Sequence, residues 1–185
     1  ETVHIHMNEF IAKKLGEVLA FAEVGKETFE KGHVGMEAAF GIERTAQIMR
    51  DNTMHATTIR TIGKEFDVLD IIDKKLHSTG TKLRAMRDLY IGDQWDNPTE
   101  LLEWSGFFEG AAIVHWQLVL GAAETLNTLQ KSLGHDDLVS IATSGVELHH
   151  GIFHEASTHL HHVGSDKANP HIVPNPTNST LREKL

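Results

Sequence analysis

Apolar side chains recur at intervals of three and four residues through most of this chain, and no other feature constrains its fold as strongly. The most regular series is Ala142, Val146, His149, Phe153, Ala156 and Leu160. Residues at this spacing share one side of an α-helix, which can then pack against a core. No stretch shows the apolar–polar alternation of a half-buried strand. The sequence therefore predicts an all-α protein.

The periodic segments predict five helices, at about residues 8–31, 35–51, 54–78, 98–133 and 136–163. We expect a turn or kink at Asp51-Asn52-Thr53, and an interruption at Gly80 followed by a further helical piece. We expect Gly164 to end the last helix. The resulting architecture is an antiparallel four-helix bundle with additional helical length over residues 1–164 and an extended C-terminal tail over residues 165–185.

The start of the fourth helix is the best-defined boundary. Asn97 is a good N-cap, and Pro98 fits the first helical position, where no N–H partner is needed. Glu100 follows in the first turn, where the helix dipole favours a carboxylate. These residues predict a helix that begins at Pro98.

The composition, with 40% hydrophobic and 23% charged residues, is that of a globular domain and not of a disordered chain. No apolar run approaches the roughly 20 residues that span a bilayer, so we expect no membrane span. The net charge of −9 argues against nucleic acid as the main partner, since phosphate binding needs a basic face.

The chain contains no cysteine, which excludes disulfides and thiolate metal sites. Any metal site must therefore use imidazole and carboxylate. Absence of cysteine fits cytosol or periplasm, and we slightly favour cytosol. The first residue is Glu1, compatible with removal of an N-terminal segment, and no signal-peptide pattern follows it.

The 14 histidines make metal chemistry the first function to test, and one cluster stands out among them. Glu147, His150 and His154 lie at positions i, i+3 and i+7, on one side of the fifth helix. A Glu-x-x-His pair lets a carboxylate bridge two metals while the imidazole binds one. We expect the adjacent His149 to point more directly into the core. The competing interpretation is a solvated, histidine-rich face.

Carboxylates and a histidine on other helices are candidate partners for this cluster. Glu43 and Glu109 lie on or beside apolar faces, where a carboxylate is costly unless it is paired or metal-bound. His115 falls within the apolar stripe of the fourth helix. Glu27, with Glu23 and Glu30, is either directed inward or part of a solvated acidic face. For Glu43 the alternative is an arginine partner, and for His115 an ordinary hydrogen-bonded core histidine.

An antiparallel bundle with inward glutamates and a Glu-x-x-His resembles the ferritin-like carboxylate superfamily. There, two helices each give a Glu and the other two each give a Glu-x-x-His. The resemblance covers about residues 10–163 and implies one complete motif at Glu147 and His150. It implies lone carboxylates at Glu27 (or Glu23), Glu43 and Glu109. A second Glu-x-x-His is missing, because Ala46 stands three residues after Glu43. We expect His115 or His55 to replace the missing imidazole.

The function that this resemblance implies is metal binding, with one or two iron (or manganese) ions held by Glu and His ligands. The associated chemistry is oxygen or peroxide activation or iron oxidation, which makes the chain a candidate metal-dependent oxidoreductase. Three alternatives stay open. The chain is a non-catalytic assembly module that forms a homo-oligomer, a haem-binding bundle with His115 and His149 as ligands, or a phosphotransfer bundle.

Overall fold

The computed structural model describes residues 7–126 and 136–169, and within these residues it contains six helices and no strand. The prediction of an all-α fold is thereby confirmed. The helices are α1 (Glu9–Lys31), α2 (His33–Phe40), α3 (Ile42–Glu65), α4 (Leu69–Ile91), α5 (Pro98–Glu124) and α7 (Asp136–Ala168).

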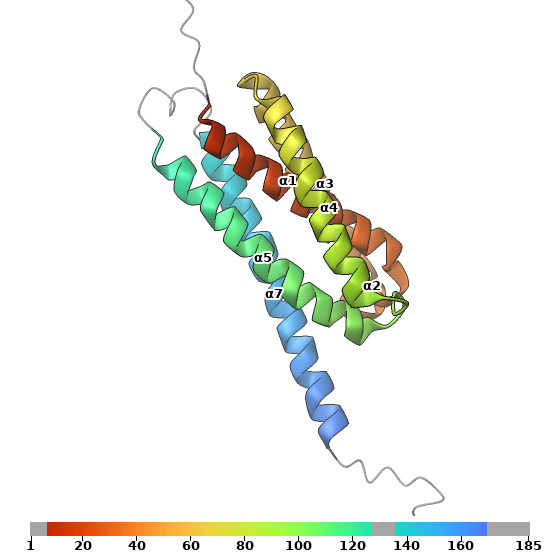
Figure 1. Ribbon diagram of the computed structural model, residues 1–185. Helices are drawn as coiled ribbons and strands as arrows, with labels where there is room; N and C mark the ends of the chain where they lie inside the picture. The colour runs from red at the N-terminus through yellow and green to blue at the C-terminus, as the bar shows by residue number, and fades with distance from the viewer. Residues whose placement is uncertain (1–6, 127–135, 170–185) are drawn as a thin grey trace, which may run out of the picture.

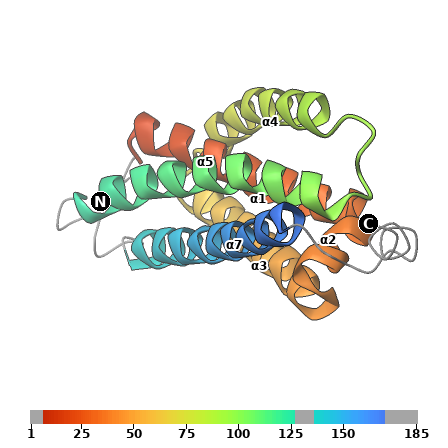
Figure 2. The same ribbon diagram turned by 90° about the horizontal axis from the view of Figure 1, so that it is seen from below.

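The helices pack side by side as an elongated bundle (Figure 1). The most extensive contacts join α5 to α7, which run in opposite directions, and α1 to α4. Seen from below, α4 lies at one edge, α3 and α7 lie at the other, and α1 and α5 lie between them (Figure 2). The C-terminal part of α7 extends beyond the ends of the other helices, so that its last turns are mostly exposed (Figure 1).

Several predicted boundaries are confirmed. Helix α5 begins at Pro98, and the side chain of Asn97 accepts a hydrogen bond from the backbone N–H of Thr99, 3.1 Å away. Asn8 caps α1 in the same way, through the backbone N–H of Phe10. In both places a capping side chain satisfies a backbone donor that has no partner within the helix.

Other predicted boundaries are wrong. The expected turn at Asp51-Asn52-Thr53 is regular helix within α3, and the break lies instead at Gly41, whose positive φ of 89° suits glycine. The predicted helix over 54–78 is divided by a turn after Glu65. Gly80 and Gly164 both lie inside helices. A glycine within a helix costs only about 1 kcal/mol relative to alanine, which packing of the surrounding residues can offset.

The apolar core consists of two clusters along the bundle. The first lies around Leu15, Ile59 and Trp116, and the second lies around Phe21, Ile48 and Phe108. Trp116 lies directly against Gly145, where an added Cβ would approach the indole to 2.2 Å. This glycine therefore sets how closely α5 and α7 approach each other.

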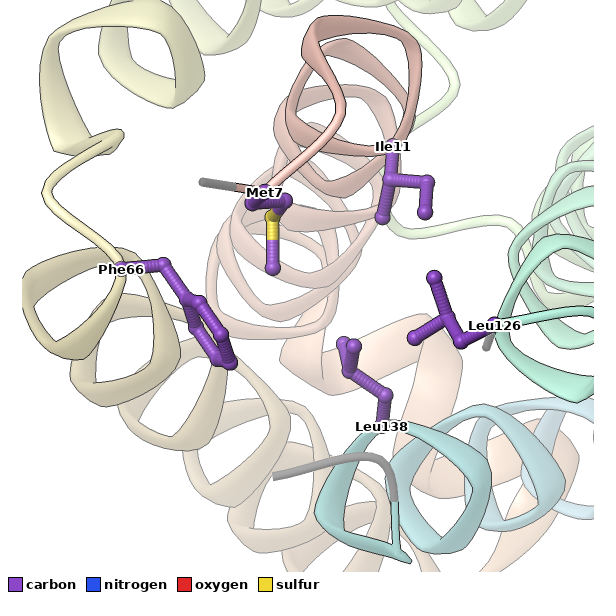
Figure 3. A pocket seen from close by; sticks show the side chains of 5 residues that line it. All are labelled: Met7, Ile11, Phe66, Leu126 and Leu138. Atoms are coloured by element: carbon purple, nitrogen blue, oxygen red, sulfur yellow. The ribbon is translucent and has the colours of Figure 1, made fainter. Parts of the chain in front are cut away.

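A small pocket opens at the end of the first cluster, beside the start of α1 (Figure 3). Its volume is about 10 Å³, and its five lining side chains are Met7, Ile11, Phe66, Leu126 and Leu138. All five are apolar and point toward a common space (Figure 3). The pocket is therefore a packing defect, and its lining contains no polar side chain that could carry chemistry.

Candidate functional site

Four polar side chains lie where the two apolar clusters meet. They are Asn52 and His55 of α3, Glu109 of α5 and His149 of α7, and none is more than 2% exposed. We call them the interior polar layer. Along α5, for example, Glu109 stands between Phe108 of one cluster and Trp116 of the other. Because apolar residues flank the layer, each polar atom in it must find a partner inside the protein or remain unsatisfied.

Glu109 and His149 form a buried pair across the α5–α7 contact. The ring Nδ1 of His149 is directed at Oε2 of Glu109 and donates a hydrogen bond to it. This contact fixes the orientation of the imidazole. It leaves Nε2, on the far side of the ring, as the nitrogen available to another partner.

His55 is the second imidazole of the layer. Its Nε2 lies 3.0 Å from the hydroxyl of Ser144 on α7, and its ring packs edge-on against Trp116 at a centroid distance of 5.3 Å. Burial lowers the pKa of His55 to about 4, and the neighbouring His149 lowers it further in the same direction. His55 is therefore neutral at pH 7, the form in which an imidazole can bind a metal.

Three atoms of the layer have no hydrogen-bond partner among the described residues. They are Nε2 of His149, Nδ1 of His55 and Oδ1 of Asn52. An unsatisfied buried polar group costs about 1–3 kcal/mol, so three such atoms in one layer require a physical reason. All three are of the kinds that ligate metal ions, since imidazole nitrogen and amide oxygen both carry a free lone pair.

A cleft between α3 and the start of α7 leads to this layer. Its volume is about 180 Å³, and its wall includes His55 and Thr58 of α3 with Asp137, Ser140 and Ser144 of α7. His55 itself is almost fully buried, so it forms the floor of the cleft. The cleft, which Met54 and Ile141 also line, provides a route by which water or an ion can reach the histidine.

The predicted ligands lie in different surroundings. Glu109 is buried as expected, and His149 points into the core as expected. His115 is half-buried at the edge of α5, where Nδ1 donates to the carbonyl of Ala111 at 2.7 Å and Nε2 lies 4.0 Å from Glu17. The remaining carboxylates and histidines of the predicted set are exposed or partly exposed: Glu27, Glu43, Glu147, His150 and His154.

Glu147, His150 and His154 share the solvent-facing side of α7, so helical geometry keeps them away from Glu109. Glu43 is exposed at the first turn of α3. Arg44, which follows it in the sequence and could have been the expected arginine partner, binds Glu155 of α7 at 3.0 Å. The structure therefore does not bring Glu43 and the exposed α7 cluster together with Glu109.

Glu27 is engaged by two arginines of α4. Its carboxylate oxygens accept hydrogen bonds from Arg84 at 3.0 Å and from Arg87 at 2.8 Å. Partial burial alone would raise the pKa of Glu27, but the hydrogen bonds and charges of Arg87 and Arg84 outweigh burial and lower it. Glu27 thus joins α1 to α4 and is not directed at the interior polar layer.

Sequence reasoning missed two buried polar residues. Asn52 was assigned to a turn, although Ile48, Asn52 and Ile59 follow the helical spacing that would have placed it on the apolar side of α3. Glu17 of α1 is also buried and binds Lys14 at 3.1 Å and Lys75 at 3.6 Å. Its position inside an apolar run of α1 was the available signal.

No family model, curated protein or solved structure matches the chain.

In the part of the chain that the structure describes, no helix has the apolar length needed to cross a membrane. Nor do any three His, Asp or Glu side chains of residues 7–126 and 136–169 converge as a ready-made metal site. Any metal site in the interior polar layer must therefore draw on the two imidazoles, with the amide of Asn52 as the remaining protein donor.

Proposed function

We propose that this chain is a metal-binding helical bundle that holds one divalent metal ion in the interior polar layer. The observation that carries the proposal is the state of His149, whose Nδ1 is bound to Glu109 while its buried Nε2 has no partner. Metal-binding histidines characteristically donate their second ring N–H to a carboxylate, which orients the ring and makes it a better ligand. Glu109 fits this role as a positioning residue.

His55 supplies the second imidazole of the proposed site. Its lowered pKa keeps the ring neutral, and the unpartnered Nδ1 is available for coordination. Asn52 precedes it by one helical turn on α3 and contributes an unpartnered amide oxygen. These buried, unpartnered donors are the reason why we favour metal binding over a purely structural role for the layer.

The interior polar layer retains only part of the ligand set of the ferritin-like superfamily. His55 and His149 are buried imidazoles on two helices, and Glu109 is a lone carboxylate on another. Asn52 and Val146 stand where the superfamily motif has glutamate. Because those glutamates bridge metals in the superfamily, their replacement favours one ion over two.

Imidazole-rich sites also take zinc or copper, but a site of nitrogen and oxygen donors without sulfur suits iron or manganese. Such an ion would supply the oxygen, peroxide or iron-oxidation chemistry expected of an oxidoreductase. The chain's own contribution is to orient His149 through Glu109, to exclude bulk water by the flanking apolar clusters, and to admit solutes through the cleft at His55.

The exposed residues Glu147, His150 and His154 form a second set of donors on α7. The pair His150 and His154, one turn apart, can chelate an ion at the surface. We propose this pair as a weaker, solvent-exposed site. It has to be separated from the interior site in any experiment.

A second candidate function is self-association as an assembly module. The outer face of α5 presents large apolar side chains to solvent. A continuous exposed apolar stripe of this kind is unusual for a monomer. A homo-oligomer does not exclude the metal site, because the interior polar layer lies on the opposite side of α5 from this stripe.

Metal analysis of the full chain, purified without a His-tag, tests the proposal. After anaerobic reconstitution with Fe(II) and removal of loosely bound ions, we expect about one equivalent of iron per chain to remain, because an ion dissociates slowly from a buried site. An absorption spectrum of the same sample separates the haem alternative, which would give a Soret band. Retention of much less than one equivalent of Fe(II) would contradict the proposal.

A further inference from the structure

A stripe of uncharged residues runs along the outer face of α5. Its members are Phe107, Gly110, Val114, Leu118 and Gly121, which we call the α5 stripe. Phe107, Val114 and Leu118 are 62%, 60% and 41% exposed. Among the described residues, the ring of Tyr90 packs against Phe107, but all three side chains remain substantially exposed. Large apolar groups this exposed at helical spacing are typical of a surface that another helix covers.

No carboxylate, lysine or arginine interrupts the stripe. Between Glu103 and Glu124 the only such residue of α5 is Glu109, which is buried and directed at His149. When two identical surfaces pair about a two-fold axis, a charge near the axis lies close to its own copy, and a charge farther away is buried against an apolar residue. Both situations are destabilising. The absence of exposed charge over this length of α5 removes that penalty.

The order of large and small residues in the α5 stripe is symmetric about Val114. Phe107 lies seven residues before Val114 and Gly121 seven after it, while Gly110 lies four before and Leu118 four after. In an antiparallel pair of identical helices, residues equally far from the centre in opposite directions face each other. Phe107 and Leu118 of one copy therefore each meet a glycine of the other, and Val114 meets Val114.

The space at the two glycines fits these contacts. A Cβ built on Gly121 would meet nothing within 4 Å, so the ring of a partner's Phe107 has room there. At Gly110 the nearest atoms belong to the ring of Phe153, at 3.6 Å. Gly110 and Phe153 thus form an apolar surface that the Leu118 side chain of a second copy can contact.

Phe107 is held in place for such a contact. The ring of Tyr90, at the end of α4, packs against it at a centroid distance of 5.1 Å, and the Tyr90 hydroxyl donates to Glu103 at 3.1 Å. Leu89 and Met86 of α4 extend the apolar surface beyond Tyr90. A side chain that is already ordered loses less conformational freedom when it is buried by a partner.

We propose that two copies of this chain form a homodimer in which their α5 helices pair antiparallel about a two-fold axis at Val114. Such an interface uses the same surface on both copies, as a two-fold dimer requires. The α5 stripe is about 21 Å long at 1.5 Å per residue. This is short for an interface, so Tyr90 and Phe153 at its margins contribute, and the dimer dissociates on dilution.

Sedimentation of the full chain over a range of concentrations, combined with one substitution on the axis, tests the dimer. Wild type should shift from monomer to dimer as concentration rises. Val114→Glu places two carboxylates against each other on the axis and should weaken dimerisation by at least about a hundredfold. Val34→Glu, at a similarly exposed apolar residue of α2, is the matched control and should leave the dimer unchanged. Unaltered helical circular dichroism would show that both variants fold.

A cysteine on the axis tests the geometry. The chain has no cysteine, so Val114→Cys introduces a single thiol that meets its own copy within disulfide range under mild oxidation. Val34→Cys should not cross-link above the background of random collision. A chain that stays monomeric at every concentration overturns the proposal, and so does a dimer that survives Val114→Glu. A dimer sensitive to Val114→Glu in which Val114→Cys fails to cross-link overturns the antiparallel pairing at Val114. None of these outcomes depends on metal binding.

Discussion

The imidazole of His149 faces the carboxylate of Glu109 inside the bundle, and the two side chains are only 1% and 2% exposed. Removing one member of a pair this deeply buried strongly lowers the free energy of unfolding. Replacing both members with apolar residues lowers it less. The pair therefore gives a direct way to measure what the interior polar layer contributes to stability.

Replacing His149 alone should be strongly destabilising. His149→Leu leaves the Glu109 carboxylate without its partner in an apolar environment, and we expect the free energy of unfolding to fall by about 3–5 kcal/mol. The double variant His149→Leu/Glu109→Met removes both polar groups and should recover most of this loss. Urea unfolding of metal-free protein at one protein concentration measures both. A double variant as unstable as the sum of the two single variants would show that the residues do not act as a pair.

Stability of the metal-free protein should fall as pH is lowered through the range in which His55 titrates. Its pKa is about 4 in the folded protein against an ordinary value of 6.5. Between these values the unfolded state binds a proton that the folded state does not, so stability is complete above pH 6.5 and is lost toward pH 4. The difference between these two pKa values corresponds to roughly 3–4 kcal/mol at most.

Comparison with His55→Gln isolates this contribution, because the amide cannot take up the proton. The stability of His55→Gln should depend less on pH between 6.5 and 4 than that of wild type, whereas the exposed His154→Gln should follow wild type. Equal pH dependence in His55→Gln and wild type would mean that His55 is not the neutral, buried histidine described above.

Gly145 should not tolerate even one added methyl group. In Gly145→Ala the new Cβ would lie 2.2 Å from the Trp116 indole, so α5 and α7 must separate. We expect a loss of about 1–3 kcal/mol, typical of an overpacked core. Gly164→Ala is the matched control, since its Cβ meets nothing within 4 Å and it lies inside α7. That substitution should raise stability by about 0.5–1 kcal/mol. Thermal unfolding that ranks the two variants in the reverse order would contradict the packing seen here.

The sequence predicted the fold class well because amphipathic periodicity is a local property. It located α1 and the start of α5 through caps that act on neighbouring backbone groups. It failed at Gly80 and Gly164, where tertiary packing and helix continuity outweigh the modest helix propensity of glycine. It also missed the turn after Glu65, which contains neither proline nor glycine.

The candidate site was harder to predict because adjacent helix positions differ by about 100° in direction. His149 and His150 are sequence neighbours, yet the first is buried and the second is exposed. The Glu-x-x-His spacing drew attention to His150, whereas the partner of His149, Glu109, lies 40 residues away on another helix. Such a pairing depends on the register between α5 and α7, which periodicity alone does not specify.

Metal binding in the interior polar layer is tested most directly by titrating cobalt(II) into a chain whose exposed α7 histidines have been replaced by glutamine. In this background, from which surface chelation is absent, we predict one tightly bound cobalt(II) with visible absorption. Adding Glu109→Gln should weaken binding by about 10–100-fold, as expected for loss of an orienting partner. Adding His149→Gln should abolish it. Binding of equal affinity and spectrum with and without His149 would contradict the proposed site.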